Sequence, residues 1–289
     1  MLIVKVPGIN GLGKTQGCEG AGNALIESLK NIYSNEQGKQ VNVKELDLEE
    51  IHLDNFNLDL TNKLIYKNAF ESFYKERVIF LGGDHSISYS LTRAFLDFCQ
   101  HNGKEPCLIV FDAHPDLMQP SSEFPTHEEW LRKLIEDGFP VENVLLIGIR
   151  NSDIEEVKFM NEKKMKIISV NQIQGNLQDI ADAITEFANR KELYVSIDID
   201  AVDPAFAPST GYAEVGGLTS REIIYLIQRL NKVKTLKAVD IVEINPEKDS
   251  EIDKSISDSK TFKEKQKVSD KNKDNLTVKL GAKILSEFL

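Results

Sequence analysis

Short apolar segments recur along the chain, and most of them are apolar at successive positions, as in VIFL and CLIVF. Strands that are apolar on both faces are typical of a parallel sheet covered by helices on its two sides. We predict eight strands, at 2–6, 41–46, 78–81, 107–111, 144–149, 166–170, 193–199 and 237–242.

Amphipathic segments of helical length lie between several of these strands, and one more ends the chain. They cover 24–32, 88–99, 130–137, 221–230 and 277–289. Alternation of strands and helices in one series indicates an α/β fold. We therefore predict a single domain over 1–289, with three α/β/α layers and a mostly parallel sheet of about eight strands.

One segment breaks this pattern. Residues 246–275 are strongly polar, and their sizeable apolar residues are only Ile252, Ile256, Phe262 and Val268. Such a stretch buries too little apolar surface to offset its ordering entropy. We expect a mobile insertion here, and a solvated surface helix is the alternative.

Charge and cysteine content limit the partners. The chain has 46 acidic and 35 basic residues, for a net charge of -11. Such a field repels phosphate backbones, so we expect no nucleic-acid partner. The three cysteines are widely spaced and fit free thiols in a reducing cytosol. We see no apolar run near the roughly 18 residues of a membrane span and expect no secretory leader. We therefore predict a cytoplasmic protein without a membrane partner.

Residues 8–15 (GINGLGKT) match the phosphate-loop pattern GxxxxGK[ST] after a predicted strand. In such a loop, Lys14 and Thr15 would bind a nucleotide at the start of a helix. Gly17, Gly20 and Gly22 disfavour a helix there, each by about 1 kcal/mol relative to alanine. The segment is therefore either a glycine-rich connection between a strand and a helix or the phosphate loop of a nucleotide-binding protein. The second is the alternative from another functional class.

Acids and histidines follow three of the predicted strands. They lie in Gly82–Ser86 (GGDHS), Asp112–Asp116 (DAHPD) and Ser196–Pro204 (SIDIDAVDP). Alternation along an extended chain would project Asp112, His114 and Asp116 together, and likewise Asp198 and Asp200.

Ligands of open α/β sheets bind beyond the carboxyl ends of the strands, where these groups would meet. Carboxylates that converge without lysine or arginine need cations, and four aspartates balance two divalent ions. Oxygen ligands with some imidazole suit Mn²⁺ better than a structural zinc site. Taken alone, His85 also fits a structural role and Asp203 a turn.

These motifs resemble the ureohydrolase family, which includes arginase, agmatinase and formimidoylglutamase. The segments at 207–211 (APSTG), 216–219 (GGLT) and 242–246 (VEINP) continue the resemblance. It implies a three-layer α/β/α fold with two Mn²⁺ ions per subunit.

The resemblance also implies roles for single residues. One ion would be held by His85, Asp112, Asp116 and Asp198, and the other by His114, Asp112, Asp198 and Asp200. Glu243 matches the residue that pairs with a substrate guanidinium. Water activated between the ions would attack the guanidinium carbon, Asp116 would pass a proton to the departing amine, and His127 would shuttle protons.

Departures from the family pattern bear on the substrate. Arginases place an asparagine, for the substrate carboxylate, where this chain has Met118, and Asp153 lies in the loop whose acid can bind the amino end. Tyr212 also replaces a threonine at the pocket rim. We therefore expect a small guanidino substrate, agmatine-like rather than arginine, and a homo-oligomer (trimer or hexamer). A non-catalytic metal-binding member of the fold is a further alternative.

Overall fold

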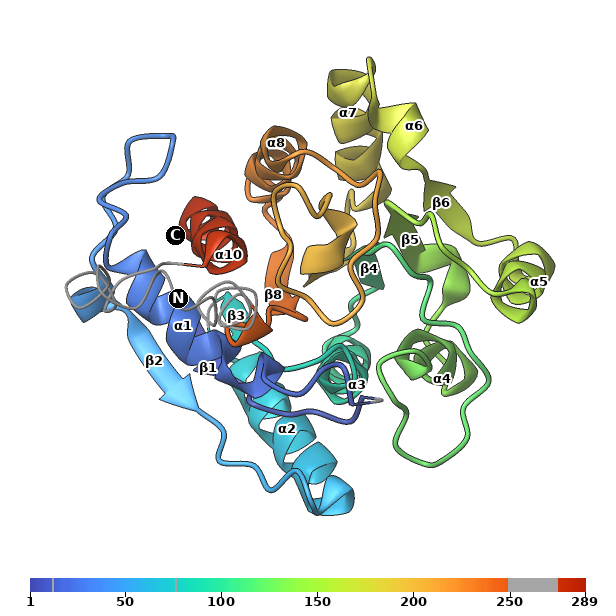
Figure 1. Cartoon of the computed structure of the whole chain (residues 1–289). Coiled ribbons are helices and arrows are strands. Elements are labelled where there is room, and N and C mark those ends of the chain that lie inside the picture. Colours follow the sequence, from blue (N-terminus) through green and yellow to red (C-terminus); the bar gives the residue numbers. More distant parts are fainter. Residues whose placement is uncertain (12, 76, 249–274) are drawn as a thin grey trace, which may run out of the picture.

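The computed structural model describes residues 1–11, 13–75, 77–248 and 275–289. Its centre is one sheet of eight strands, all parallel, in the order β2-β1-β3-β8-β7-β4-β5-β6 (Figure 1). The strands are β1 Leu2–Lys5, β2 Asp47–Glu50, β3 Val78–Leu81, β4 Pro106–Phe111, β5 Val144–Ile147, β6 Lys166–Ile168, β7 Glu192–Asp198 and β8 Leu236–Val242. The predicted α/β class and sheet size are confirmed.

Helices cover both faces of this sheet. They are α1 Ala21–Leu29, α2 Leu58–Ser72, α3 Ile87–His101, α4 Trp130–Glu136, α5 Ile154–Lys163, α6 Val170–Ile173, α7 Leu177–Phe187, α8 Ser220–Leu230 and α10 Leu276–Phe288. Short 3-10 turns occur at Cys18–Gly20, Val43–Glu45, Val141–Asn143 and Ile199–Ala201.

Successive strand residues enter two different cores, as expected for strands that are apolar on both faces. In β3, Ile79 and Leu81 belong to the core that includes residues of α1, α7, α8 and α10, whereas Val78 and Phe80 belong to the core that includes residues of α2, α3 and α4. Three layers follow from this division. The central strands are thereby fixed from both sides, and their carboxyl ends become a firm platform for side chains.

The strand predicted at 41–46 is wrong. That segment contains the 3-10 turn at Val43–Glu45, and the edge strand β2 begins only at Asp47. Asn42 accepts a hydrogen bond from the Lys44 N–H and so caps the turn. The four residues of β2 are exposed, so the edge strand carries no apolar signal.

The phosphate-loop interpretation of residues 8–15 also fails in the structure. Residues 14–17 form a turn, and the first helical residues are those of the 3-10 turn at Cys18. The Thr15 hydroxyl donates to Asp84 Oδ2 at 3.1 Å, so it is engaged inside the protein. The geometry that would place a helix N-terminus at Lys14 is therefore missing from this described segment.

The polar insertion predicted at 246–275 lies, apart from its ends, outside the described residues. Within the described ranges, no helix combines the length and the apolarity needed to cross a membrane.

Candidate active site

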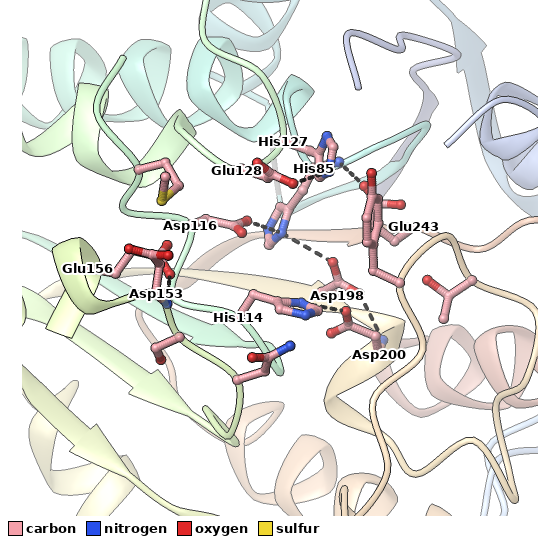
Figure 2. Close-up of a pocket in the computed structure, with 15 residues that line it drawn as sticks. His85, His114, Asp116, His127, Glu128, Asp153, Glu156, Asp198, Asp200 and Glu243 are labelled. Carbon is pink, nitrogen blue, oxygen red and sulfur yellow. Dashed lines mark hydrogen bonds and ion pairs between the residues drawn. The ribbon is translucent and has the colours of Figure 1, made fainter. Parts of the chain in front are cut away.

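Four adjacent strands place the candidate site. His85 follows β3, Asp112 follows β4, Asp198 ends β7 and Glu243 follows β8. In the sheet these strands lie in the order β3-β8-β7-β4, so their carboxyl ends share one edge. A cavity of about 330 Å³ opens there, and Figure 2 shows the side chains that line it.

The loop before His85 depends on a glycine. A Cβ on Gly83 would lie 1.8 Å from the Gly8 carbonyl oxygen, so no larger residue fits between β3 and the N-terminal loop. Asp84 then accepts hydrogen bonds from the Asn10 N–H at 2.8 Å and from Ser86. These contacts fix the direction in which the His85 ring enters the cavity.

The strand alternation expected at Asp112–Asp116 is wrong, although the three side chains do converge. β4 ends at Phe111, and Asp116 has a left-handed backbone conformation with φ 54°. Likewise, β7 ends at Asp198, and Asp200 lies in a 3-10 turn. The Asp200 N–H donates to Asp198 Oδ1 at 2.8 Å. Turns and loop hydrogen bonds, rather than extended strand, bring these acids together.

Two groups of side chains offer ligand atoms close enough to share a metal ion. The first is His85, Asp112 and Asp116, and the second is Asp112, His114 and Asp200. His85 Nδ1 lies 3.0 Å from Asp112 Oδ2 and from Asp116 Oδ2. Asp112 belongs to both groups. Asp198 belongs to neither, and its Oδ2 lies 3.3 Å from His85 Nδ1.

Hydrogen bonding supports a metal at this cluster. His85 Nδ1 and Asp112 Oδ2 are buried and, although they lie 3.0 Å apart, neither forms a hydrogen bond of proper geometry. Buried polar atoms are rarely left without a partner unless an ion or another group binds them. The imidazole and carboxylate donors therefore fit a divalent cation.

The electrostatics of the protein alone point the same way. Burial and the neighbouring Asp112 raise the pKa of Asp116 to about 8. Burial lowers the pKa of His114, but contacts with Asp112 and Asp200 outweigh it and raise the pKa to about 12. The cluster thus holds protons in place of other cations, which is how buried acids avoid mutual repulsion.

The distal nitrogen of His85 has its own support. His85 Nε2 is 2.9 Å from Ser196 Oγ, and that hydroxyl donates to Asp240 Oδ1 at 2.6 Å. Tyr194 and Ser88 also donate to Asp240. This network was missed from the sequence, where the signal is a lone acid inside the apolar strand β8.

Glu243 lies in the cavity wall with both oxygens engaged. Its Oε1 accepts the His85 N–H at 2.9 Å, and its Oε2 is 3.8 Å from Cys18 Sγ. Burial and the charge of Asp84 raise the pKa of Glu243 well above its usual value. A carboxylate in that environment gains from a cationic partner in the cavity.

His127 and Tyr212 line the cavity with their rings in contact, at a centroid distance of 5.0 Å and an interplanar angle of 32°. Lys14 Nζ lies 4.6 Å from the Tyr212 centroid. Burial, with the charge of His85, lowers the pKa of His127 to about 4. Both ring nitrogens of His127 are buried without a hydrogen-bond partner, and Nε2 lies 3.7 Å from Glu128 Oε1.

Asp153 lies across the cluster from Glu243 (Figure 2). It caps α5, because its Oδ1 accepts the Glu155 N–H at 2.9 Å. Glu156 is used internally, since its oxygens accept the N–H groups of Asp153 and Leu117. Met118 and Glu128 line the same cavity. The structure thus brings every sequence-predicted site residue to one cavity or its wall.

An open parallel sheet with an acid and imidazole cluster at its carboxyl edge defines an α/β/α protein with a candidate metal centre. The Arginase family model matches residues 1–288, and the chain belongs to this family. It is thus an arginase-family ureohydrolase, an enzyme of the class that hydrolyses amidino C–N bonds.

Individual relatives agree. An arginase of Staphylococcus aureus is 29% identical over 249 residues, which cover 77% of this chain and 80% of the relative. The structure of formimidoylglutamase from Bacillus subtilis is similar with a TM-score of 0.79 and 19% identity, over 99% of this chain and 85% of that one. Agmatine ureohydrolase of Thermoplasma volcanium gives a TM-score of 0.78 and 22% identity, over 99% and 87%. At these identities the two structures support the fold alone.

Proposed function

We propose that this chain is a binuclear manganese ureohydrolase that cleaves a small guanidino compound to urea and an amine, with agmatine favoured over arginine. The observation that carries the proposal is one cavity in which Glu243 and Asp153 lie on opposite sides of an acid and imidazole cluster (Figure 2). A substrate with a cationic group at each end matches that arrangement.

The metal ligands in this proposal are His85, Asp112, His114, Asp116, Asp198 and Asp200. Four carboxylates and two imidazoles favour Mn²⁺ over the thiolate-rich sites of structural zinc. When bound, such ions act as Lewis acids and lower the pKa of water to near neutrality.

The protein side chains bind and orient the substrate. Glu243 receives the guanidinium, because a buried carboxylate forms strong charge-assisted hydrogen bonds with it. The His85 N–H holds Glu243 Oε1 in place, so the carboxylate is oriented before the substrate arrives. The guanidinium carbon is thereby directed toward the Asp112 and Asp198 side of the cavity.

Two residues move protons. Asp116 lies at the cluster, where it would take up the proton released by the attacking water and pass it to the departing amine nitrogen. His127 is neutral near pH 7, because its pKa is lowered to about 4, and a neutral imidazole accepts a proton. We infer that His127 passes protons between the site and solvent.

The outer end of the cavity favours an amine-ended substrate. Asp153 and Glu128 are acidic, Met118 offers no hydrogen bond, and none of the described residues that line the cavity is lysine or arginine. A substrate carboxylate would meet acids without a cationic partner, whereas an ammonium would be attracted.

We also propose a homo-oligomer, trimer or hexamer, which analytical ultracentrifugation would test.

The experiment is a substrate panel. Chain loaded with Mn²⁺ is given agmatine, arginine, guanidinobutyrate and guanidinopropionate, and urea is measured, with ammonia from formimidoylglutamate in parallel. We expect kcat/KM for agmatine to exceed that for arginine at least tenfold. A higher value for arginine would overturn the substrate preference. Silence on every compound with two ions bound would favour the non-catalytic alternative.

A further inference from the structure

Trp130, the one tryptophan of the chain, touches the candidate metal cluster directly. It is the first residue of α4 and is fully buried. Its indole Nε1–H donates a hydrogen bond to Asp116 Oδ2 at 2.7 Å. The indole also lies against the His85 ring, with centroids 4.7 Å apart and planes at 38°. One side chain therefore contacts two of the three residues of the first ligand group.

The start of α4 holds Asp116 through the backbone as well. The Arg132 N–H donates to the Asp116 carbonyl oxygen at 3.3 Å. Asp116 has a left-handed backbone, which persists in a non-glycine residue only where its surroundings enforce it. Glu129, just before α4, accepts the Ser121 and Thr126 N–H groups and so anchors this helix end. Side chain and main chain of Asp116 are thus fixed by one element.

We propose that Trp130 is a positioning residue for one of the two ions, the one that His85, Asp112 and Asp116 would hold. Its N–H fixes the rotation of the Asp116 carboxylate, and its ring fixes the plane of His85. This inference rests on the proposed function, because it requires that the cluster bind metal. Groups that orient metal ligands in this way typically change affinity or activity 10- to 100-fold when removed.

The test separates hydrogen bonding from packing. Trp130→Phe keeps an aromatic ring beside His85 and removes the N–H. Mn²⁺ binding to metal-free chain is measured by calorimetry for wild type and variant. We expect one of the two affinities to fall about 10- to 100-fold and the other to change less than about threefold. Turnover should show a similar loss in kcat, with KM within about twofold.

The matched control is Phe73→Leu. Phe73 is equally buried, and its ring contacts are with Phe80, Phe95 and Phe98. That variant should lose thermal stability and keep both Mn²⁺ affinities. Equal affinities in Trp130→Phe and wild type would overturn the proposal, and so would equal losses at both ions. Wild-type chain that binds no Mn²⁺ would instead refute the proposed function.

A second measurement needs no variant. Tryptophan emission of the wild-type chain comes from Trp130 alone, because no other tryptophan exists. Titration with Mn²⁺, a paramagnetic ion, should quench this emission as the ion beside Asp116 binds. Two ions bound per chain with unchanged emission would overturn the placement of Trp130 beside an ion.

Discussion

The backbone N–H of His85 donates to Glu243 Oε1 at 2.9 Å, across the end of β3 and β8. The Glu243 N–H in turn donates to the Gly83 carbonyl oxygen at 3.0 Å. These reciprocal bonds join the loop that carries a candidate metal ligand to the carboxylate that would bind the substrate. The proposed metal and substrate positions would therefore be set by one hydrogen-bonded connection rather than by independent loops.

Glu243→Gln separates charge from geometry at this connection. The amide oxygen can still accept the His85 N–H, so the loop should stay in place. Loss of the charge-assisted bonds to a guanidinium should raise KM roughly 10- to 100-fold. Elemental analysis should still find two Mn²⁺ ions per chain. Loss of metal would show that Glu243 supports the ions rather than the substrate.

Asp198→Ala should abolish both metal retention and urea formation. Asp198 lies 3.3 Å from His85 Nδ1 and also accepts the Asp200 N–H. The substitution therefore removes the carboxylate beside His85 and the hydrogen bond that holds Asp200. Asp198→Asn keeps an acceptor for Asp200 and should still lose metal. The control is Asp182→Ala on α7, where the carboxylate is 66% exposed. Two retained ions in Asp198→Ala would contradict the ligand assignment.

Asp153→Asn tests the outer end of the cavity. Asparagine also caps helices, so α5 should remain intact. We expect KM for agmatine to rise about tenfold, because a charge-assisted bond to its ammonium is lost. KM for guanidinobutyrate, which ends in a carboxylate, should stay equal or fall. A uniform change across the substrate panel would instead mean a general structural role, and Glu162→Gln on the same helix is the control.

Metal-free chain should lose stability as the pH rises above about 6.5. The folded state raises the pKa of Asp116 to about 8 and of His114 to about 12, so it retains protons that the unfolded chain releases. Each retained proton lowers the free energy of unfolding by about 1.4 kcal/mol per pH unit. Between about pH 4 and 6.5 the lowered pKa of His127 acts in the opposite sense to the raised pKa of Asp116, and above that range its ring becomes neutral in both states.

Thermal unfolding measures this effect. Between pH 7 and 8.5, the Tm of chelator-treated protein should fall by roughly 5 °C. The stabilisation that bound Mn²⁺ provides should grow over the same pH range, because metal ligands must be deprotonated to bind. The Tm gap between loaded and metal-free chain should widen with pH. A metal-free Tm that is flat or rises over this range would contradict the raised pKa values of Asp116 and His114.

The motif at 8–15 should bind no nucleotide. Thr15 is tied to Asp84, and Lys14 stacks on Tyr212. Calorimetry with ATP and Mg²⁺ should therefore give no saturable binding below about 1 mM. Saturable binding that Lys14→Ala abolishes would restore the phosphate-loop alternative.

Much of the fold was predictable because seven of the eight strands are apolar segments that bury at least part of their surface. The edge strand β2 was not, because its four residues are exposed and three of them are acidic. The clustering of Asp112 and Asp116 was predictable from sequence order at strand ends. The left-handed backbone of Asp116 and its contacts with α4 were not, since no local sequence pattern contains them.

The contacts around the candidate metal-ligating residues were also hard to predict, because their partners are distant in the sequence. Trp130 lies 14 residues from Asp116, and Asp240 lies 44 from Ser196. Such pairs depend on how elements pack, and a local pattern does not contain that information. An acid inside an apolar strand, as at Asp240, is a sequence signal for a buried partner that the sequence analysis did not use.

The position of β8 has a consequence for how the chain folds. β8 pairs with β3 on one side and β7 on the other, although it comes last in chain order among the eight strands of the described residues. Until it inserts, β2-β1-β3 and β7-β4-β5-β6 are two separate parts of the sheet. His85 belongs to the first part, and Asp112 and Asp198 belong to the second. We therefore expect the metal site to form only at this late step of folding, when a nascent chain has extended past residue 242, so that captured metal ions would report completed assembly.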